Sequence, residues 1–372
     1  MRYSTLLLLS ILVGLPGGAA SRKAKNVILF LADAGGVSTV NAASLHGYDA
    51  PMKLYVQSMP FIGLMDTSTA SAWVSDSAAG MTAIVTGVKT HNGVISMGPD
   101  TVRGQKDGRI LKTLLEEAEE RGLSTGVITN VNIADATPAA CYAHANDRRK
   151  HGEIFLQLFD PKHGDGVDVV IGGGRAAVYK AVKELGKDLD AVAAEKNRPV
   201  RGTLAEVPAG DSRPIVVSSQ EPDVAAAAWM AIDRLSKNKK GYFLMVEWDA
   251  HTDDPKKGLD NLVNLDKLIR EIAGKVNLNE TLLIFTADHS FDLRVRGGKP
   301  GEPLLKGWEE WKQNNAGKKP PYLDLPSLRQ FGSHTAEEVI VAAQGAGADQ
   351  VRGFLPNTKI HEIALRAWGW RR

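Results

Sequence analysis

The chain has 372 residues, 43% of them hydrophobic, and its 45 lysines and arginines nearly balance its 43 aspartates and glutamates. This length is enough for a large core in one or two domains. A net charge of +2, with residues 147–150 as the only notable basic run, leaves no electrostatic footprint for nucleic acid, so we exclude that class of partner. Cys141 is the only cysteine, which excludes an internal disulfide.

The N-terminus has the pattern of an export signal. Arg2 supplies positive charge, and the apolar residues 6–15 are too few to span a bilayer. Small residues follow, which predicts cleavage after Ala20. We therefore expect residues 1–20 to be a signal peptide of a periplasmic or extracellular protein without stable membrane insertion. An uncleaved anchor is the alternative. The mature domain would span residues 21–372.

Five short apolar runs have the length and composition of buried parallel strands. Between them, helical periodicity occurs at residues 110–118, stopped by Gly122, and again at residues 225–235 and 259–272. This alternation predicts an α/β fold, a three-layer α/β/α sandwich with a mostly parallel central sheet. The five predicted strands are residues 27–32, 125–129, 168–171, 242–246 and 281–287.

Candidate ligands follow three of these predicted strands. The first strand leads into Asp33, the fourth into Glu247, and the fifth into Asp288 and His289. In open α/β sheets ligands bind beyond the carboxyl ends of the strands, so we expect a site there. Residues 290–333, rich in Gly, Pro and Lys, are predicted to be an insertion over that site.

The spacing of imidazoles and carboxylates suits a metal. His334 directly follows the predicted insertion, and Glu247 and His251 are four residues apart. This spacing predicts that the latter two lie on one face of a helical turn. Carboxylates and imidazoles in a roughly tetrahedral set are ligands that zinc prefers.

A serine lies at the expected start of a small-residue helix. Ser77 follows Asp76 and precedes two alanines, so its hydroxyl would lie over free backbone N–H groups at the positive helix end. Such a position favours phosphate. An aspartate–serine pair before alanines is also an ordinary helix cap. The ligands at the strand ends favour the functional interpretation.

Six motifs, taken together and in this order, resemble the bacterial alkaline phosphatases of the alkaline phosphatase superfamily. The resemblance runs from residue 26 to the last predicted helix, and the Asp-Ser-Ala-Ala and Thr-Ala-Asp-His signatures are its most specific parts. It implies an exported, metal-dependent phosphomonoesterase that acts on small phosphate monoesters, with a homodimer as a possible assembly. The motifs are residues 31–33, 76–79, 86–93, 135–139, 286–289 and 333–335.

The resemblance also implies roles for individual residues. Ser77 would be the nucleophile that becomes a phosphoserine. Arg148 would clamp two phosphate oxygens in a bidentate way, and Asp76 would orient that arginine. Asp135 and Thr137 lie where the family builds a third, magnesium site.

Two zinc sites are implied as well. Asp33, Asp288 and His289 would hold one ion. His251 and His334 would belong to the other, whose carboxylate depends on the alignment around Glu247.

The segment around Glu247 departs from the family pattern. The family has a magnesium glutamate, a zinc aspartate five residues later and a zinc histidine four further on; from Glu247 these offsets reach Thr252 and Lys256. We favour a register in which Glu247 is the zinc carboxylate beside His251, which leaves the magnesium site without its glutamate. In the alternative register Glu247 is the magnesium ligand, and Asp249 or Asp253 would complete the zinc site.

Two other functions remain as alternatives. A phosphodiesterase on the same fold often uses threonine and lacks the arginine clamp. A secreted protein that binds phosphate or metal without turnover would not need Ser77 or Arg148. A sulfatase is excluded, because no Cys/Ser-x-Pro-x-Arg pattern surrounds Ser77.

Overall fold

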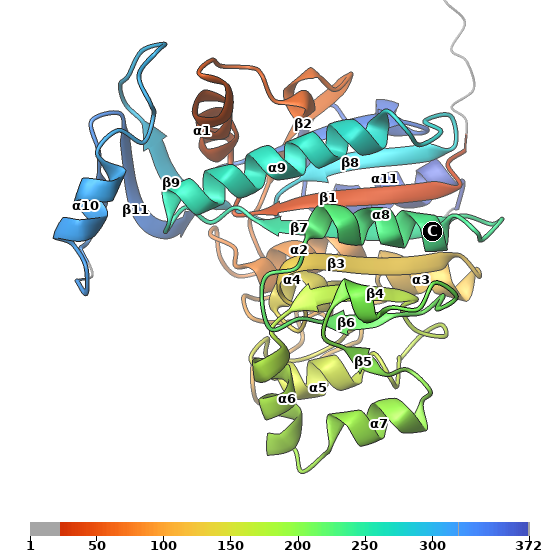
Figure 1. Cartoon of the computed structure of the whole chain (residues 1–372). Coiled ribbons are helices and arrows are strands. Elements are labelled where there is room, and N and C mark those ends of the chain that lie inside the picture. The colour runs from red at the N-terminus through yellow and green to blue at the C-terminus, as the bar shows by residue number, and fades with distance from the viewer. Residues whose placement is uncertain (1–22, 319, 371–372) are drawn as a thin grey trace, which may run out of the picture.

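The computed structural model describes residues 23–318 and 320–370, and the predicted signal peptide at residues 1–20 lies outside them. A central sheet has helices on both faces (Figure 1). This arrangement confirms the predicted three-layer α/β/α sandwich. Within the described residues, none of the helices combines the length and apolarity that crossing a bilayer requires.

Ten strands form the central sheet. They are β1 (Asn26–Asp33), β2 (Phe61–Asp66), β3 (Ser124–Asn132), β4 (Val169–Gly173), β5 (Val200–Arg201), β6 (Ile215–Val217), β7 (Tyr242–Asp249), β8 (Thr281–Thr286), β12 (Val339–Gly345) and β13 (Gly353–Pro356). Their order is β13-β2-β12-β8-β1-β7-β3-β4-β6-β5. β12 is antiparallel to both of its neighbours, and the other pairs are parallel, which confirms a mostly parallel sheet.

Helices cover the two faces and one end of the sheet (Figure 1). One face carries α1 (Val37–Tyr48), α8 (Val224–Leu235) and α9 (Pro255–Ala273), and the other carries α2 (Ser77–Thr86), α3 (Leu114–Glu120), α4 (Ala136–Tyr142) and α11 (Lys359–Trp368). Near β5 lie α5 (His151–Leu156), α6 (Arg175–Glu184) and α7 (Leu189–Glu195). Short 3-10 helices are η1 (Tyr55–Ser58), η2 (Leu204–Glu206) and η3 (Ala348–Gln350).

The core lies on both sides of the sheet because strand side chains alternate between faces. On β1, Leu29 and Leu31 belong to the cluster that includes Met81 of α2. Phe30, between them, belongs to the opposite cluster with Leu262 of α9. Full burial of each such side chain contributes about 1.5–3 kcal/mol relative to exposure. The continuous apolar runs of the central strands are thus explained by burial on both faces.

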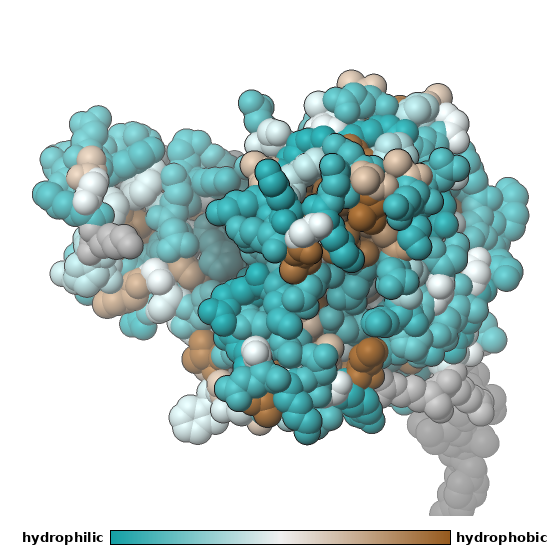
Figure 2. Space-filling model, turned by 90° about the horizontal axis from the view of Figure 1, so that it is seen from below, coloured by the Kyte–Doolittle hydropathy of each residue, from teal (hydrophilic) through white to brown (hydrophobic). Residues whose placement is uncertain are grey.

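The segment predicted as an insertion forms a small antiparallel sheet with one helix. Its elements are β9 (Ser290–Val295), α10 (Trp308–Asn314), β10 (Leu323–Asp324) and β11 (Leu328–Thr335), with the strand order β10-β11-β9. It projects from the main body at the side toward which β1, β7 and β8 point (Figure 1). In the surface view a hollow separates this lobe from the body (Figure 2). The Gly- and Lys-rich composition of this segment did not predict that it forms strands.

Two predicted helices begin at other residues because of their caps. The helix expected from Ile110 begins at Leu114, since Thr113 Oγ1 accepts from the Glu116 amide and Glu116 accepts from the Thr113 amide. The third helix begins earlier than expected, at Pro255, whose fixed φ suits the first helical turn.

The helical turn predicted for Glu247 and His251 is wrong. β7 continues as a strand to Asp249, because its ladder with β1 pairs Leu31 with Glu247 and Asp33 with Asp249. In extended backbone, residues two apart share a face and residues four apart lie far from each other. The parallel pairing therefore overrides the local helical spacing.

Candidate metal and phosphate site

Parallel pairing gathers carboxylates at the ends of the three central strands. β1 lies between β7 and β8, and its last residue, Asp33, is paired with Asp249. On the other side Leu31 is paired with Thr286, so Asp288 follows two residues later, at the level of Asp33. Asp33 and Asp288 are buried. Side chains far apart in the sequence thus share one edge of the sheet.

Ser77 is the first residue of α2, as the sequence predicts. Its Oγ lies 3.2 Å from His289 Nε2 and 3.5 Å from Asp33 Oδ2. The helix approaches the strand ends so closely that a Cβ added at Gly80 would lie 2.4 Å from the Asp288 carbonyl oxygen. Glycine at this position therefore permits the contact. Ser77 is buried, so its hydroxyl is held among these groups at a helix N-terminus.

Asp76 and Arg148 lie beside Ser77. Asp76 caps α2 by accepting from the Ala79 amide at 3.1 Å, and its other oxygen lies 3.2 Å from Arg148 Nη1. Arg148 Nη2 donates to Asp135 at 2.9 Å. Burial opposes the charge of the guanidinium, but Asp135 and Asp76 hold the pKa of Arg148 above its usual value. A permanently charged, oriented fork therefore lies next to the serine.

Three imidazoles come together from separate elements. The rings of His289 and His334 stack with centroids 3.8 Å apart, and His251 Nε2 lies 3.5 Å from His334 Nε2. His334 Nδ1 lies 2.8 Å from the Ser75 carbonyl oxygen and donates to it, which leaves Nε2 with its lone pair. That nitrogen is available to a metal ion.

These groups shift one another's pKa values. Burial would raise the pKa of Asp33, but His251 and His289 hold it well below its usual value. Burial likewise opposes protonation of His251, yet Asp33 and Asp249 raise its pKa to about 9. Burial and the neighbouring His289 lower the pKa of His334 to about 4. Carboxylates and imidazoles that compete for protons in this way are a donor set for a divalent cation.

The donor atoms fit two zinc ions by number and type. Asp33, Asp288 and His289 form one set with ligand atoms within 4.8 Å of one another. Asp33 and His251 form a second set with Asp249, and the three imidazoles form a third. Glu247 is absent from all three sets in the described part of the chain.

Glu247 instead lies deep beneath the strand ends. It is fully buried, and the Thr129 side chain contributes a hydrogen bond that only partly offsets this burial. Burial raises its pKa well above the usual value, and Asp33, Asp288 and Asp135 raise it further. A buried carboxylate near three others is an oxygen-rich setting that suits magnesium. Thr137 Oγ1 lies 3.4 Å from Oδ2 of Asp288, one of these neighbouring carboxylates.

A family model described as Alkaline phosphatase matches residues 24–198 and 214–323. The chain belongs to the alkaline phosphatase family.

Two relatives and one solved structure illustrate the likeness. The chain is 31% identical to alkaline phosphatase 4 of Bacillus subtilis over 308 residues, 75% of this chain and 64% of that protein. It is 29% identical to streptomycin-6-phosphate phosphatase of Streptomyces griseus over 94% of this chain and 91% of that protein. A TAB5 alkaline phosphatase mutant with magnesium in its M3 site matches with a TM-score of 0.74 and 25% identity, covering 94% and 99% of the two chains. The chain thus spans slightly less than two thirds of the length of the Bacillus relative.

The family signatures led to most of the side chains that meet here. Residues 76–77, 288–289 and 334 are brought together, with Arg148 and Asp135 beside them. The sequence predicts Asp249 as a zinc ligand only in the alternative register. In the structure its Oδ1 lies 2.7 Å from His251 Nδ1. Asp249 lies at the end of a strand, level with Asp33. This position is the feature that could have identified it as a metal ligand.

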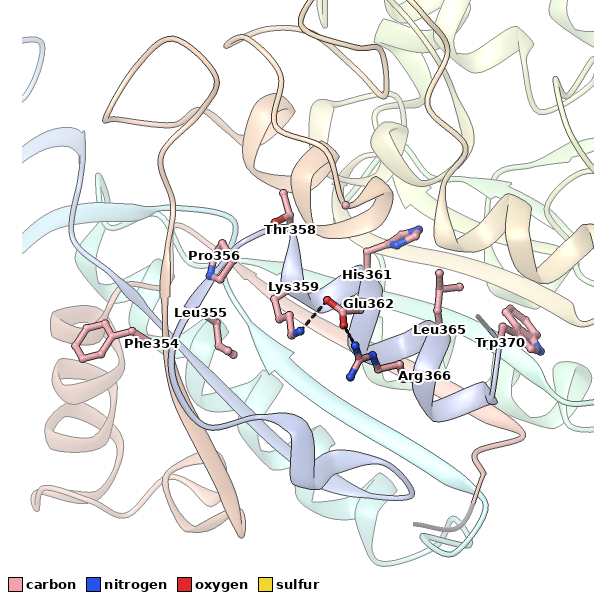
Figure 3. Close-up of a pocket in the computed structure, with 11 residues that line it drawn as sticks. Phe354, Leu355, Pro356, Thr358, Lys359, His361, Glu362, Leu365, Arg366 and Trp370 are labelled. Atoms are coloured by element: carbon pink, nitrogen blue, oxygen red, sulfur yellow. Dashed lines mark hydrogen bonds and ion pairs between the residues drawn. The ribbon is translucent and has the colours of Figure 1, made fainter. Parts of the chain in front are cut away.

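A separate cavity of about 860 Å³ lies away from these residues, between β13 and α11 (Figure 3). Glu362 forms ion pairs with Lys359 and Arg366 along its floor. Phe354 lies at its edge with its side chain largely exposed. No residue of the metal and phosphate site described above lines this cavity.

Proposed function

We propose that this protein is an exported, metal-dependent phosphomonoesterase that forms a phosphoserine at Ser77. The observation that carries the proposal is the position of the Ser77 hydroxyl, at the N-terminus of α2 and 3.2 Å from His289, with the Arg148 fork beside it. Family membership supports the same reaction class.

The residues would hold two zinc ions. Asp33, Asp288 and His289 would bind one, and His251, His334 and the β7 carboxylate Asp249 would complete the other. When bound, the ions would supply charge neutralisation and would lower the pKa of bound oxygen nucleophiles.

A magnesium ion would suit the third site. The buried carboxylate of Glu247, with Thr137 and Asp135 near Asp288, supports it. Glu247 thus belongs to the third site, in agreement with the alternative register.

The chain's own groups account for the rest of the reaction. Ser77 Oγ gives up its proton and attacks phosphorus, the ester P–O bond breaks, and the leaving oxygen takes up a proton and departs as the alcohol. Water then attacks the phosphoserine, the bond between phosphorus and Ser77 Oγ breaks, and inorganic phosphate leaves as the serine hydroxyl is restored. Arg148 binds two non-bridging oxygens and holds the phosphoryl group for in-line attack. Asp76 and Asp135 orient its guanidinium from two sides.

The substrates would be small phosphate monoesters, because the guanidinium suits a phosphoryl group with several free oxygens. The same feature weighs against a diesterase. Export through residues 1–20 and a homodimer are further parts of this proposal.

A chromogenic phosphate monoester tests the function. Purified protein supplied with zinc and magnesium should hydrolyse it, and a chelator should abolish the activity until zinc is restored. An apo protein that is fully active, or a zinc-loaded protein without any phosphomonoesterase activity, would contradict the proposal. The corresponding diester should be a much poorer substrate.

A further inference from the structure

The chain passes the site at both ends of the projecting lobe. His289 directly precedes Ser290, the first residue of β9, and His334 directly precedes Thr335, the last residue of β11. These end residues are cross-strand partners in the antiparallel pairing of β9 with β11. Whatever holds this pair therefore holds both imidazoles.

Glu337 lies against this pair. Its Oε2 accepts from Ser290 Oγ at 2.6 Å, and Ser290 Oγ also lies 2.8 Å from Thr335 Oγ1. Its Oε1 accepts from Ser38 Oγ at 3.0 Å, in the first turn of α1. One half-buried carboxylate thus joins both ends of the lobe to the helix that follows Asp33.

The surroundings of Glu337 leave little room for movement. A Cβ at Gly36 would lie 2.5 Å from Glu337 Oε2 and 2.5 Å from Ser290 Oγ, so only glycine allows this approach. The backbone of Gly36 also bridges to Val339 at the start of β12. At the other end of α1, Asp49 accepts from the Gly301 amide of the lobe at 2.7 Å. α1 is therefore tied to the lobe at both ends.

We propose that Glu337 is a positioning residue that fixes His289 and His334 for metal binding by clamping the two ends of the lobe to α1. Glu337 is itself outside every candidate ligand set in the described residues. The inference rests on the proposed function, since it assumes that these imidazoles bind zinc. Partners that orient ligands from outside the coordination sphere typically change metal affinity 10- to 100-fold when they are removed.

The test measures zinc affinity by competition with a chromogenic chelator, and the visible spectrum of the cobalt(II) form. Glu337→Ala should bind zinc about 10- to 100-fold more weakly and alter the cobalt spectrum. Glu337→Gln should lose less, because its amide oxygen can still accept one hydroxyl. Glu338→Gln, at the exposed neighbouring position, is the matched control and should match the wild type in both measurements.

Ser38→Ala removes only the hydrogen bond between Glu337 and α1. If Glu337→Ala does not fold, zinc affinity and the cobalt spectrum are measured on Ser38→Ala instead. It should weaken zinc binding less than Glu337→Ala does. Wild-type affinity and spectrum in Glu337→Ala, or in Ser38→Ala when it alone folds, would overturn the inference. A wild type that binds no zinc would instead overturn the proposed function, and this inference with it.

Discussion

Asp33 is the direct partner of Asp249 in the parallel pairing of β1 with β7. This relationship supports our proposal that Asp249 is the β7 carboxylate of the metal site, and Asp249 Oδ1 also lies 2.7 Å from His251 Nδ1. Glu247, two residues earlier, is level with Leu31 and buried below the edge. The pairing of strands, rather than the spacing of residues along the chain, thus assigns the two acidic side chains to different places.

Metal content should separate Asp249 from Glu247. We expect Asp249→Ala to be purified with about one zinc fewer than the wild type, because its carboxylate belongs to the set with His251. Glu247→Ala should keep its zinc and lose bound magnesium. Elemental analysis of dialysed protein gives the answer. Zinc loss in Glu247→Ala alone would restore the register that the sequence favoured.

Ser77→Ala should fold normally and lose several orders of magnitude in kcat, since the nucleophile is removed while the ligands remain. Wild-type protein quenched with acid after exposure to labelled phosphate should carry the label on Ser77, and the variant should carry none. Circular dichroism controls for folding. Undiminished turnover in the variant would remove Ser77 from the mechanism.

Arg148→Ser should cost roughly 2–4 kcal/mol of transition-state stabilisation with a monoester. In the proposed clamp the guanidinium binds non-bridging oxygens, so inhibition by free phosphate should weaken as well. A diester has one fewer charged oxygen and should slow less. The measurement is kcat/KM for both substrates. Equal slowing of the two would exclude a bidentate clamp.

Glu119 should make stability depend on pH. Burial raises its pKa from 4.5 to about 8, although it accepts from Thr125 and from the Gly166 amide. Between these values the folded state holds a proton that the unfolded state lacks. Its contribution to the free energy of unfolding is therefore full below pH 4.5 and falls, as pH rises toward 8, by up to about 1.4 kcal/mol per pH unit.

Urea unfolding at several pH values between 5 and 8 checks this. Glu119→Gln should show a shallower decline of stability with pH than the wild type, by the linkage of proton binding to folding. Glu184→Gln, on the exposed face of α6, is the control and should keep the wild-type slope. Identical slopes in all three proteins would show that Glu119 does not take up the proton.

The strands that carry the site could be predicted because they are continuous apolar runs ending in polar residues. Ser77 was predictable from local cap chemistry, since Asp76 caps α2 within three residues. The backbone conformation of the chain after Val246 could not be predicted in this way. It depends on pairing with β1, which lies more than two hundred residues earlier. The lobe strands were missed for a related reason: their partners, not their own composition, make them strands.

In the part of the chain that the structure describes, the sheet neighbours of β2 are β12 and β13, which follow it by more than two hundred residues. During synthesis β2 is made well before its partners, and both of its edges must wait for strands that follow β8 in the chain. Unpaired strand edges invite association with other chains, so nascent forms of this protein need protection until β12 and β13 have been made. A chain truncated before Val339 would lose β2 from the sheet as surely as it loses β12.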